Sequence, residues 1–242
     1  MDSIYFNVRK IMGHLKAILF DLDGTLIDVD LNQFIPGYLK LLANSVAHLI
    51  SPKKMVPAIL KASVFVNSND GKIPNEEVFS NAFFPVEGYE KEEIQPLFTK
   101  FYEEGFKELK KFTKKKPEAR KVIQTAFNKG YKVVIATTPI LPLTAIEQRL
   151  DWAGVGDFPY DLITSIENSC ATKPNLLYFQ LIFKYLKLSA KECIMVGDED
   201  KDMVCSKLGS QTFLVNSSNI NLSDETPEPT YKGNLIDLIE LL

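Results

Sequence analysis

Short apolar runs alternate with amphipathic stretches along much of this chain. The apolar runs are four or five residues long, as buried strands are, and they predict strands at residues 17–20, 132–136, 161–164, 192–196 and 211–215. Between most of them, apolar positions recur at helical spacing, which predicts helices near residues 116–129, 143–153, 175–186 and 200–208. Strands separated by helices of this length indicate an α/β fold, a Rossmann-like parallel sheet with helices on both faces.

A long insertion separates the first strand from the rest of this pattern. Over residues 29–112 no stretch is typical of a strand, and apolar or aromatic residues recur every three or four positions. We therefore expect a small all-helical domain of about four helices here, and an α/β core domain made of residues 1–28 and 113–242. The basic stretch Lys107–Lys116 is interpreted as a solvated helix face. For the first dozen residues, an extra arm or helix is left open.

The composition disfavours nucleic-acid-binding, membrane-spanning and secreted proteins. The 242 residues carry a net charge of −3 at pH 7, and this slight acidity disfavours a general nucleic-acid binder, which would present a basic face. No apolar run is long enough to cross a bilayer, and the first residues do not resemble a secretion signal. Cys170, Cys193 and Cys205 have no metal-binding spacing and fit reduced thiols. We expect a soluble, cytoplasmic protein with no nucleic-acid or membrane partner; its oligomeric state is left open.

The most informative feature is the segment Ala-Ile-Leu-Phe-Asp-Leu-Asp-Gly-Thr-Leu, which begins at residue 17. Its strand delivers Asp21 and Asp23 into a glycine turn. Side chains two residues apart on a strand point the same way, so both carboxylates can share one site. Carboxylates so close repel one another unless a cation or a shared proton relieves them. The pair therefore indicates a hard metal ion or acid/base chemistry, and an acidic turn after a core strand remains the alternative.

Three further strands of the predicted sheet are followed by polar residues. Thr137 and Thr138 follow the strand at 132–136, Lys173 follows the strand at 161–164, and Asp198 and Asp202 follow the strand that ends at Val196. In an open parallel sheet, ligands bind beyond the carboxyl ends of the strands. A carboxylate cluster with a hydroxyl and an ammonium group suits a phosphoryl group and its Mg²⁺ ion. Taken alone, Thr137 is more typical of an ordinary strand-end hydroxyl, and Lys173 of an exposed loop lysine.

These motifs resemble those of the haloacid dehalogenase superfamily. The resemblance is carried by Asp-x-Asp-Gly-Thr from Asp21, a threonine at 137 after an apolar strand, Lys173-Pro174, and Gly-Asp-x-x-x-Asp from Gly197, in that order. It covers the whole α/β part of the chain. The helical insertion is similar to the superfamily's helical cap at its first insertion point.

The resemblance implies a role for each motif residue. Asp21 would be the nucleophile that forms an aspartyl-phosphate, and Asp23 the general acid and then the general base. Asp21, Asp198 and the backbone carbonyl of Asp23 would hold Mg²⁺, with Asp202 supporting the metal shell or orienting Lys173.

The remaining motif residues would bind the phosphoryl group. Thr137 would donate its hydroxyl, Lys173 would balance negative charge, and backbone N–H groups near Leu22 and Thr138 would complete the cradle. The resemblance thus implies a Mg²⁺-dependent phosphatase that hydrolyses a small phosphorylated metabolite beneath a closing cap.

Single residues of this sequence bear on the other reactions that the superfamily catalyses. Its dehalogenases lack the second aspartate, so Asp23 disfavours dehalogenation. Its capped phosphosugar mutases carry a histidine twelve residues after the nucleophile, where this chain has Gln33. Its phosphonate hydrolases use a cap lysine to form a Schiff base. The cap lysines available for this are Lys40, Lys53, Lys54 and Lys61. A non-catalytic phosphometabolite-binding protein is also an alternative, which Asp23 disfavours because binding alone needs no general acid.

Overall fold

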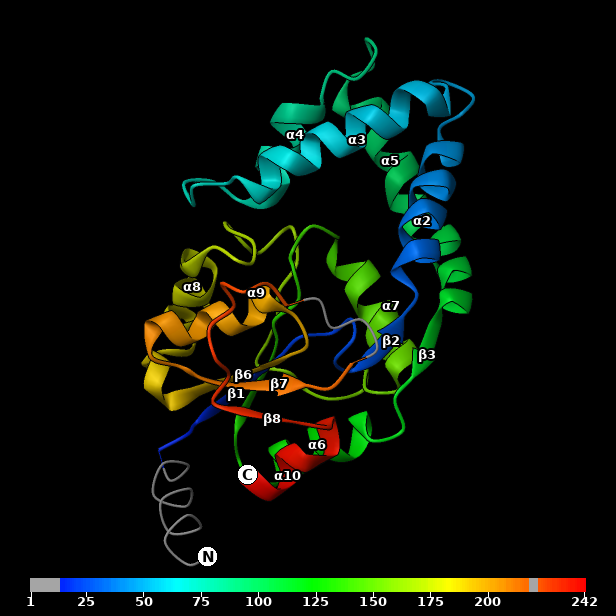
Figure 1. Cartoon of the computed structure of the whole chain (residues 1–242). Coiled ribbons are helices and arrows are strands. Elements are labelled where there is room, and N and C mark those ends of the chain that lie inside the picture. Colours follow the sequence, from blue (N-terminus) through cyan, green and yellow to red (C-terminus); the bar gives the residue numbers. More distant parts are fainter. Residues whose placement is uncertain (1–13, 218–221) are drawn as a thin grey trace, which may run out of the picture.

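The computed structural model describes residues 14–217 and 222–242 (Figure 1). The first dozen residues, for which an arm or helix was left open, lie outside this part. The core is a six-stranded parallel sheet with the order β5-β4-β1-β6-β7-β8. Its strands are β1 (Ala17–Phe20), β4 (Lys132–Ile135), β5 (Leu162–Ile163), β6 (Cys193–Gly197), β7 (Gln211–Val215) and β8 (Tyr231–Gly233). β1 pairs with both β4 and β6, so the aspartate motif leaves from the interior of the sheet.

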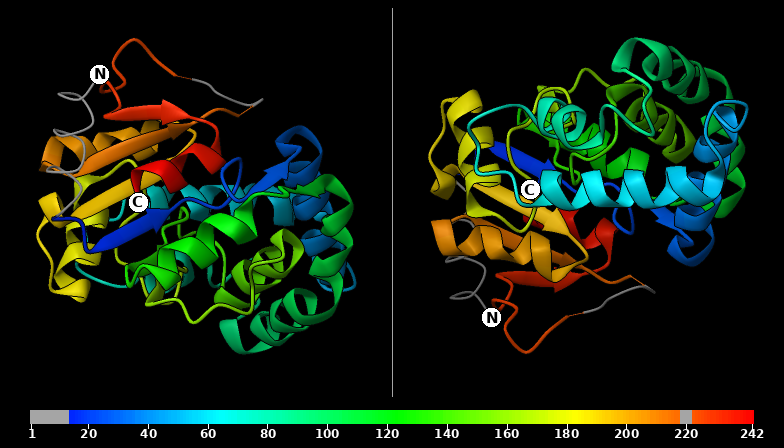
Figure 2. Two further views of the ribbon diagram at one scale, coloured as in Figure 1. Left: turned by 90° about the horizontal axis from the view of Figure 1, so that it is seen from below. Right: turned by 90° about the horizontal axis from the view of Figure 1, so that it is seen from above.

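Helices cover both faces of this sheet (Figure 2). They are α6 (Ala119–Asn128), α7 (Leu143–Ala153), α8 (Leu176–Leu186), α9 (Asp200–Met203) and α10 (Leu238–Leu241), with short 3₁₀ helices η3 (Ala190–Glu192), η4 (Val204–Leu208) and η5 (Leu235–Asp237). Strand alternation divides β1 between two apolar clusters. Ile18 and Phe20 pack in the cluster that includes α6 and α7, whereas Ala17 and Leu19 pack in the cluster that includes α8. The predicted Rossmann-like α/β fold is confirmed.

The insertion after the first motif is helical. It contains α2 (Leu31–Ser45), α3 (Pro52–Asn67), α4 (Asn75–Phe83), α5 (Lys91–Lys100), the π-helical turn η1 (Phe101–Gly105) and the 3₁₀ helix η2 (Phe106–Phe112). We call residues 31–112 the cap. Figures 1 and 2 show α3 lying across the upper side of the core, with α2 leading up to it. That residues 29–112 form a domain of their own stays a prediction.

A small antiparallel ladder joins the cap to the core. β2 (Ile27–Val29) pairs with β3 (Thr113–Lys115), so the outgoing and returning chains lie side by side. The interpretation of the basic stretch as a solvated helix face is therefore wrong at its end, although Lys107, Lys110 and Lys111 are exposed. Lys116 is buried rather than solvated. Its Nζ donates to the carbonyl of Gly24 at 2.5 Å and lies 3.3 Å from the Asp28 carboxylate, and these contacts satisfy the buried charge.

The helix predicted at residues 143–153 and the reduced cysteines agree with the structure. The helix expected at 143–153 is α7 without change, and it ends at Gly154 in the left-handed conformation that glycine favours. Cys193 is buried in β6, and all three cysteines are unpaired. Among the described residues, no helix combines the length and the apolar character needed to cross a bilayer.

Candidate active site

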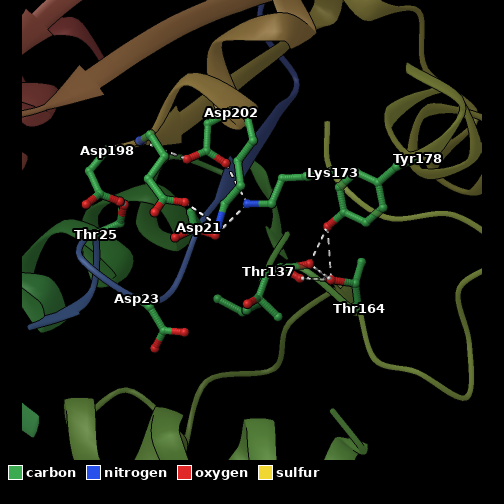
Figure 3. Close-up of polar contacts among 12 residues, drawn as sticks. Asp21, Asp23, Thr25, Thr137, Thr164, Lys173, Tyr178, Asp198 and Asp202 are labelled. Atoms are coloured by element: carbon green, nitrogen blue, oxygen red, sulfur yellow. Dashed lines mark hydrogen bonds and ion pairs between the residues drawn. The ribbon is translucent and has the colours of Figure 1, made fainter. Parts of the chain in front are cut away.

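The carboxyl ends of three adjacent strands bring predicted site residues together. Asp21 follows β1, Thr137 follows β4 and Asp198 follows β6. The loop after β5 brings Lys173 next to Asp21 and Asp202, where its Nζ donates to Asp21 Oδ1 and to Asp202 Oδ1, each at 2.5 Å (Figure 3). Burial alone would lower the pKa of Lys173, but the carboxylates of Asp202 and Asp21 outweigh it and raise that pKa. Lys173 is therefore a fixed cation between Asp21 and Asp202.

Three buried carboxylates form a cluster suited to a cation. One oxygen from each of Asp21, Asp198 and Asp202 lies within 4.8 Å of the others. Burial raises the pKa of Asp198 to about 7, and repulsion from Asp21 and Asp202 adds to the effect. Burial likewise raises the pKa of Asp202, against the opposing effect of Lys173. A divalent cation would relieve this repulsion, and an all-oxygen donor set fits Mg²⁺.

The turn after β1 holds Asp198 in this cluster. Gly24 has φ of +80°, a conformation that side chains other than glycine rarely adopt, and a Cβ at this position would collide with the Asp198 carboxylate. The hydroxyl of the next residue, Thr25, donates to Asp198 Oδ1 at 3.2 Å. The Gly-Thr part of the motif thus lets Asp198 approach and then orients it.

Asp23 lies apart from the cluster, with its carboxylate pointing away from Asp21 and Asp198 (Figure 3). Its Oδ2 accepts from Nη1 of Arg149 at 2.8 Å. The arginine side chain is 5% exposed and the aspartate side chain 27%. Burial raises the pKa of Asp23, and the nearby Arg149 charge offsets this only in part. The raised pKa suits a carboxyl group that must carry a proton.

Arg149 was not among the residues predicted from sequence. The signal that points to it is its place on α7, in the same stripe as the buried Ile146 and Leu150. A charged residue in an apolar stripe needs a buried partner, although the stripe does not say which one.

Two further residues that sequence reasoning missed support the end of β4. The hydroxyl of Tyr178 donates to the backbone carbonyl of Thr137 at 2.9 Å, and the hydroxyl of Thr164 donates to the same carbonyl at 3.0 Å. Both side chains are buried, so they fix the position from which the Thr137 side chain reaches the site.

A family model described as hydrolase, haloacid dehalogenase-like hydrolase, matches residues 15–204 of this chain. The matched region includes both acidic motifs and the whole cap. The chain belongs to the haloacid dehalogenase-like hydrolases. The resemblance drawn from the motifs is therefore confirmed at the level of the family, and the protein is a hydrolase.

Relatives extend over nearly the whole length of this hydrolase. It is 25% identical over 231 residues to phosphoglycolate phosphatase of Aquifex aeolicus (strain VF5), covering 94% of this chain and 97% of the relative. It is 23% identical over 202 residues to pyrophosphatase PpaX of Bacillus mycoides (strain KBAB4), covering 83% of each. The crystal structure of a predicted phosphoglycolate phosphatase from Haemophilus somnus 129PT has a similar fold, with a TM-score of 0.58 and 15% identity, covering 94% of this chain and 98% of that one.

The site of this haloacid dehalogenase-like hydrolase opens into a cavity of about 320 Å³ between core and cap. The core contributes polar residues to its lining, namely Asp21, Asp23, Thr137, Thr138, Arg149, Asp198, Glu199 and Lys201. Three of these carry a buried polar atom with no hydrogen-bond partner in the protein: Oδ1 of Asp23, Oγ1 of Thr138 and Nε of Arg149. Unpartnered buried polar atoms are costly, and their concentration around one cavity indicates that a polar ligand completes it.

The other predicted positions are placed as follows. The Leu22 side chain is fully buried, so only its backbone is available to a ligand. Gln33 donates to Asp30 at the start of α2 and does not line the cavity. The four cap lysines named above also lie outside its lining.

Proposed function

We propose that this hydrolase is a Mg²⁺-dependent phosphatase that cleaves a small phosphomonoester through an aspartyl-phosphate on Asp21. The observation that carries the proposal is that the two motif aspartates lie in different surroundings. Asp21 lies in the carboxylate cluster with Lys173, whereas Asp23 is turned to Arg149 at the edge of the same cavity. The names of the relatives, a phosphoglycolate phosphatase and a pyrophosphatase, support phosphoester or phosphoanhydride hydrolysis.

Asp21 is suited to attack phosphorus. One of its oxygens accepts from Lys173 Nζ, which holds this carboxyl group in place at the end of β1. The attack forms a bond from the carboxylate oxygen to phosphorus and breaks the bond from phosphorus to the ester oxygen. Water then hydrolyses the acyl phosphate and restores Asp21.

Asp23 is suited to move the protons of both steps. Its carboxyl group lines the cavity, and its raised pKa favours the protonated form from which it protonates the departing alkoxide. Once ionised, the same carboxylate accepts a proton from the water that attacks the acyl phosphate. Arg149 limits how far the pKa rises, which keeps the ionised form accessible for that second step.

The phosphoryl oxygens would be held by the remaining predicted residues. The hydroxyl of Thr137 and the backbone near Leu22 and Thr138 would donate hydrogen bonds. The unpartnered Oγ1 of Thr138 adds a further donor that the resemblance did not include. Lys173 balances the charge of the Asp21 and Asp202 carboxylates through its ion pairs with both.

The carboxylates of Asp21 and Asp198 and the backbone carbonyl of Asp23 would hold Mg²⁺. Bound there, the ion would neutralise charge between the carboxylates and the phosphoryl group, so that an anion can approach an anionic ester. Both oxygens of Asp202 already have partners, Lys173 Nζ and the backbone N–H of Glu199. We therefore favour the role of orienting Lys173 over direct metal ligation for Asp202.

The alternatives within the superfamily receive less support. A mutase would need a group near the position of Gln33 to act in the cavity, and a phosphonate hydrolase would need a cap lysine there. Neither Gln33 nor any of the four lysines considered lines it. We also propose a cytoplasmic location, since the three cysteines are unpaired thiols.

The test measures the hydrolysis of 4-nitrophenyl phosphate by the unaltered protein with Mg²⁺ and after removal of metal by a chelator. The same assay with Mg²⁺ is applied to two variants, Asp21→Asn and Asp30→Asn. We expect Asp21→Asn to lower kcat by about three orders of magnitude or more, because no nucleophile remains. Asp30→Asn is the matched control, since Asp30 is an exposed helix cap that asparagine can replace. Full activity after exhaustive chelation would contradict the metal assignment, and no hydrolysis under any of these conditions would contradict the phosphatase.

A further inference from the structure

An apolar wall lines the catalytic cavity, mostly on its cap side. Helix α2 contributes Leu31 and Ile35, helix α3 contributes Leu60, and the loop after β4 contributes Ile140. All four side chains are more than a third exposed, Ile35 and Leu60 at 49% each. They make up half of the eight large exposed apolar residues in the described part of the chain. Exposed apolar side chains gathered at one cavity indicate a binding surface.

Both cations that line the cavity are already paired with carboxylates of the lining. Arg149 is bound to Asp23, and Lys201 is bound to Glu199. The remaining charged residues of the lining are Asp21 and Asp198, and the cap contributes no charged residue to it within the described residues. A second anionic group on the substrate, remote from the phosphoryl group, would therefore be buried without a cation.

A second cavity of about 220 Å³ adjoins the first and shares Tyr38, Ile59, Ser63 and Ile140 with it. Its lining is mostly aromatic and apolar. Its charged residues are Lys91, Glu76 and Glu167, and Lys91 lies 3.9 Å from Glu76. The continuation therefore also carries an excess of negative charge, which repels an anionic end.

We propose that the substrate is a phosphomonoester of an uncharged, largely apolar alcohol, whose organic part packs against the wall of Leu31, Ile35, Leu60 and Ile140. The proposal rests on the phosphatase function and deepens it. It sets this hydrolase apart from its relatives named for phosphoglycolate and pyrophosphate, because those two compounds carry a second anionic group. Apolar contact supplies the binding free energy of the leaving group, and the core supplies the sites for the phosphoryl group.

The test compares two esters of equal chain length, hexyl phosphate and 5-carboxypentyl phosphate, with 4-nitrophenyl phosphate as the reference. We expect kcat/KM to be about tenfold or more higher for hexyl phosphate, because the carboxylate would lose its water without gaining a cation. The Leu60→Lys variant adds a cation to the wall and should reverse or abolish this preference. Phe65→Lys is the matched control, since Phe65 is exposed on the same helix and does not line either cavity; it should leave the preference unchanged.

The outcomes separate the two proposals. An equal or higher kcat/KM for 5-carboxypentyl phosphate, with 4-nitrophenyl phosphate still hydrolysed, would overturn the substrate class and leave the phosphatase standing. Equal responses to Leu60→Lys and Phe65→Lys would show that the wall does not contact the organic group and would overturn the proposal as well. Absence of Mg²⁺-dependent hydrolysis of all three esters would overturn the phosphatase, and the substrate class with it.

Discussion

At the scale of single residues, the pair formed by Asp23 and Arg149 distinguishes this site from a simple carboxylate cluster. The two side chains meet at 2.8 Å, and each keeps one buried atom without a partner beside the cavity. The arginine favours the ionised form of Asp23, whereas burial favours the protonated form and prevails. Their balance sets the pH at which Asp23 passes from acid to base.

Removal of Arg149 tests this balance. In Arg149→Met the offsetting positive charge is gone, so the pKa of Asp23 should rise further and its acid form should persist to higher pH. The basic limb of the kcat/KM profile for an alkyl phosphate should move upward by about one pH unit. Arg149→Lys keeps the charge and should move the limb less. A limb that stays in place in Arg149→Met, or moves to lower pH, would contradict the role given to this pair.

At the scale of elements, the turn after β1 connects the fold to the chemistry. Its glycine has positive φ and lies against the Asp198 carboxylate, while its carbonyl accepts from Lys116. The motif pattern predicted the turn and both aspartates. It could not predict Lys116, because the buried position of that residue depends on the β2–β3 ladder. β3 has the sequence Thr-Lys-Lys, and only pairing with its partner makes it a strand.

Two glycines separate the requirement for positive φ from the requirement for space. Gly24 and Gly130 have φ of +80° and +79°, but only at Gly24 would a Cβ meet other atoms, those of Asp198. Gly130→Ala should lower the free energy of unfolding by about 1–2 kcal/mol through backbone strain alone. Gly24→Ala should add a displacement of Asp198 and weaken Mg²⁺ binding by about tenfold or more. Urea denaturation and Mg²⁺ titration of activity measure the two effects; equal Mg²⁺ affinities in both variants would contradict the contact with Asp198.

At the scale of the whole molecule, the parallel sheet and the site motifs follow from local sequence patterns, whereas the supporting contacts do not. The predicted strands and helices correspond to apolar runs, and parallel packing brings the ends of β1, β4 and β6 to one edge. Arg149, Tyr178 and Thr164 reach the site only through tertiary packing, so spacing along the chain gave no partner for them. The cap wall likewise depends on how α2 and α3 face the core.

The carboxylate cluster makes the stability of the metal-free protein depend on pH. Burial and the neighbouring carboxylates raise the pKa of Asp198 from its usual 3.8 to about 7, so between these values the folded state binds more protons than the unfolded state. Its contribution to stability is therefore present at low pH and is lost as pH rises toward and through 7. Asp157 and Glu192, whose pKa values are lowered to about 2 by Arg120 and Lys16 respectively, change stability only below about pH 5.

Thermal unfolding measures this dependence. With EDTA present, the Tm should fall between pH 5.5 and pH 8, and Mg²⁺ should raise the Tm more at pH 8 than at pH 5.5, because protons compete with the ion for the same carboxylates. Asp198→Asn removes one of the two carboxyl groups whose pKa is raised and should weaken both trends. A metal-free Tm that rises over this range, or a Mg²⁺ effect larger at pH 5.5, would contradict the cluster as a cation site.

Phosphorylation of Asp21 is tested most directly by mass spectrometry of the trapped intermediate. Asp23→Asn keeps the nucleophile but removes the base that activates water, so an aryl phosphate or acetyl phosphate should label this variant at Asp21. We expect a phosphate-mass increase on the peptide that contains Asp21 in Asp23→Asn, and none in Asp21→Asn. Near-normal turnover by Asp21→Asn together with no labelled peptide in Asp23→Asn would mean that water attacks phosphorus directly, and it would contradict the covalent mechanism.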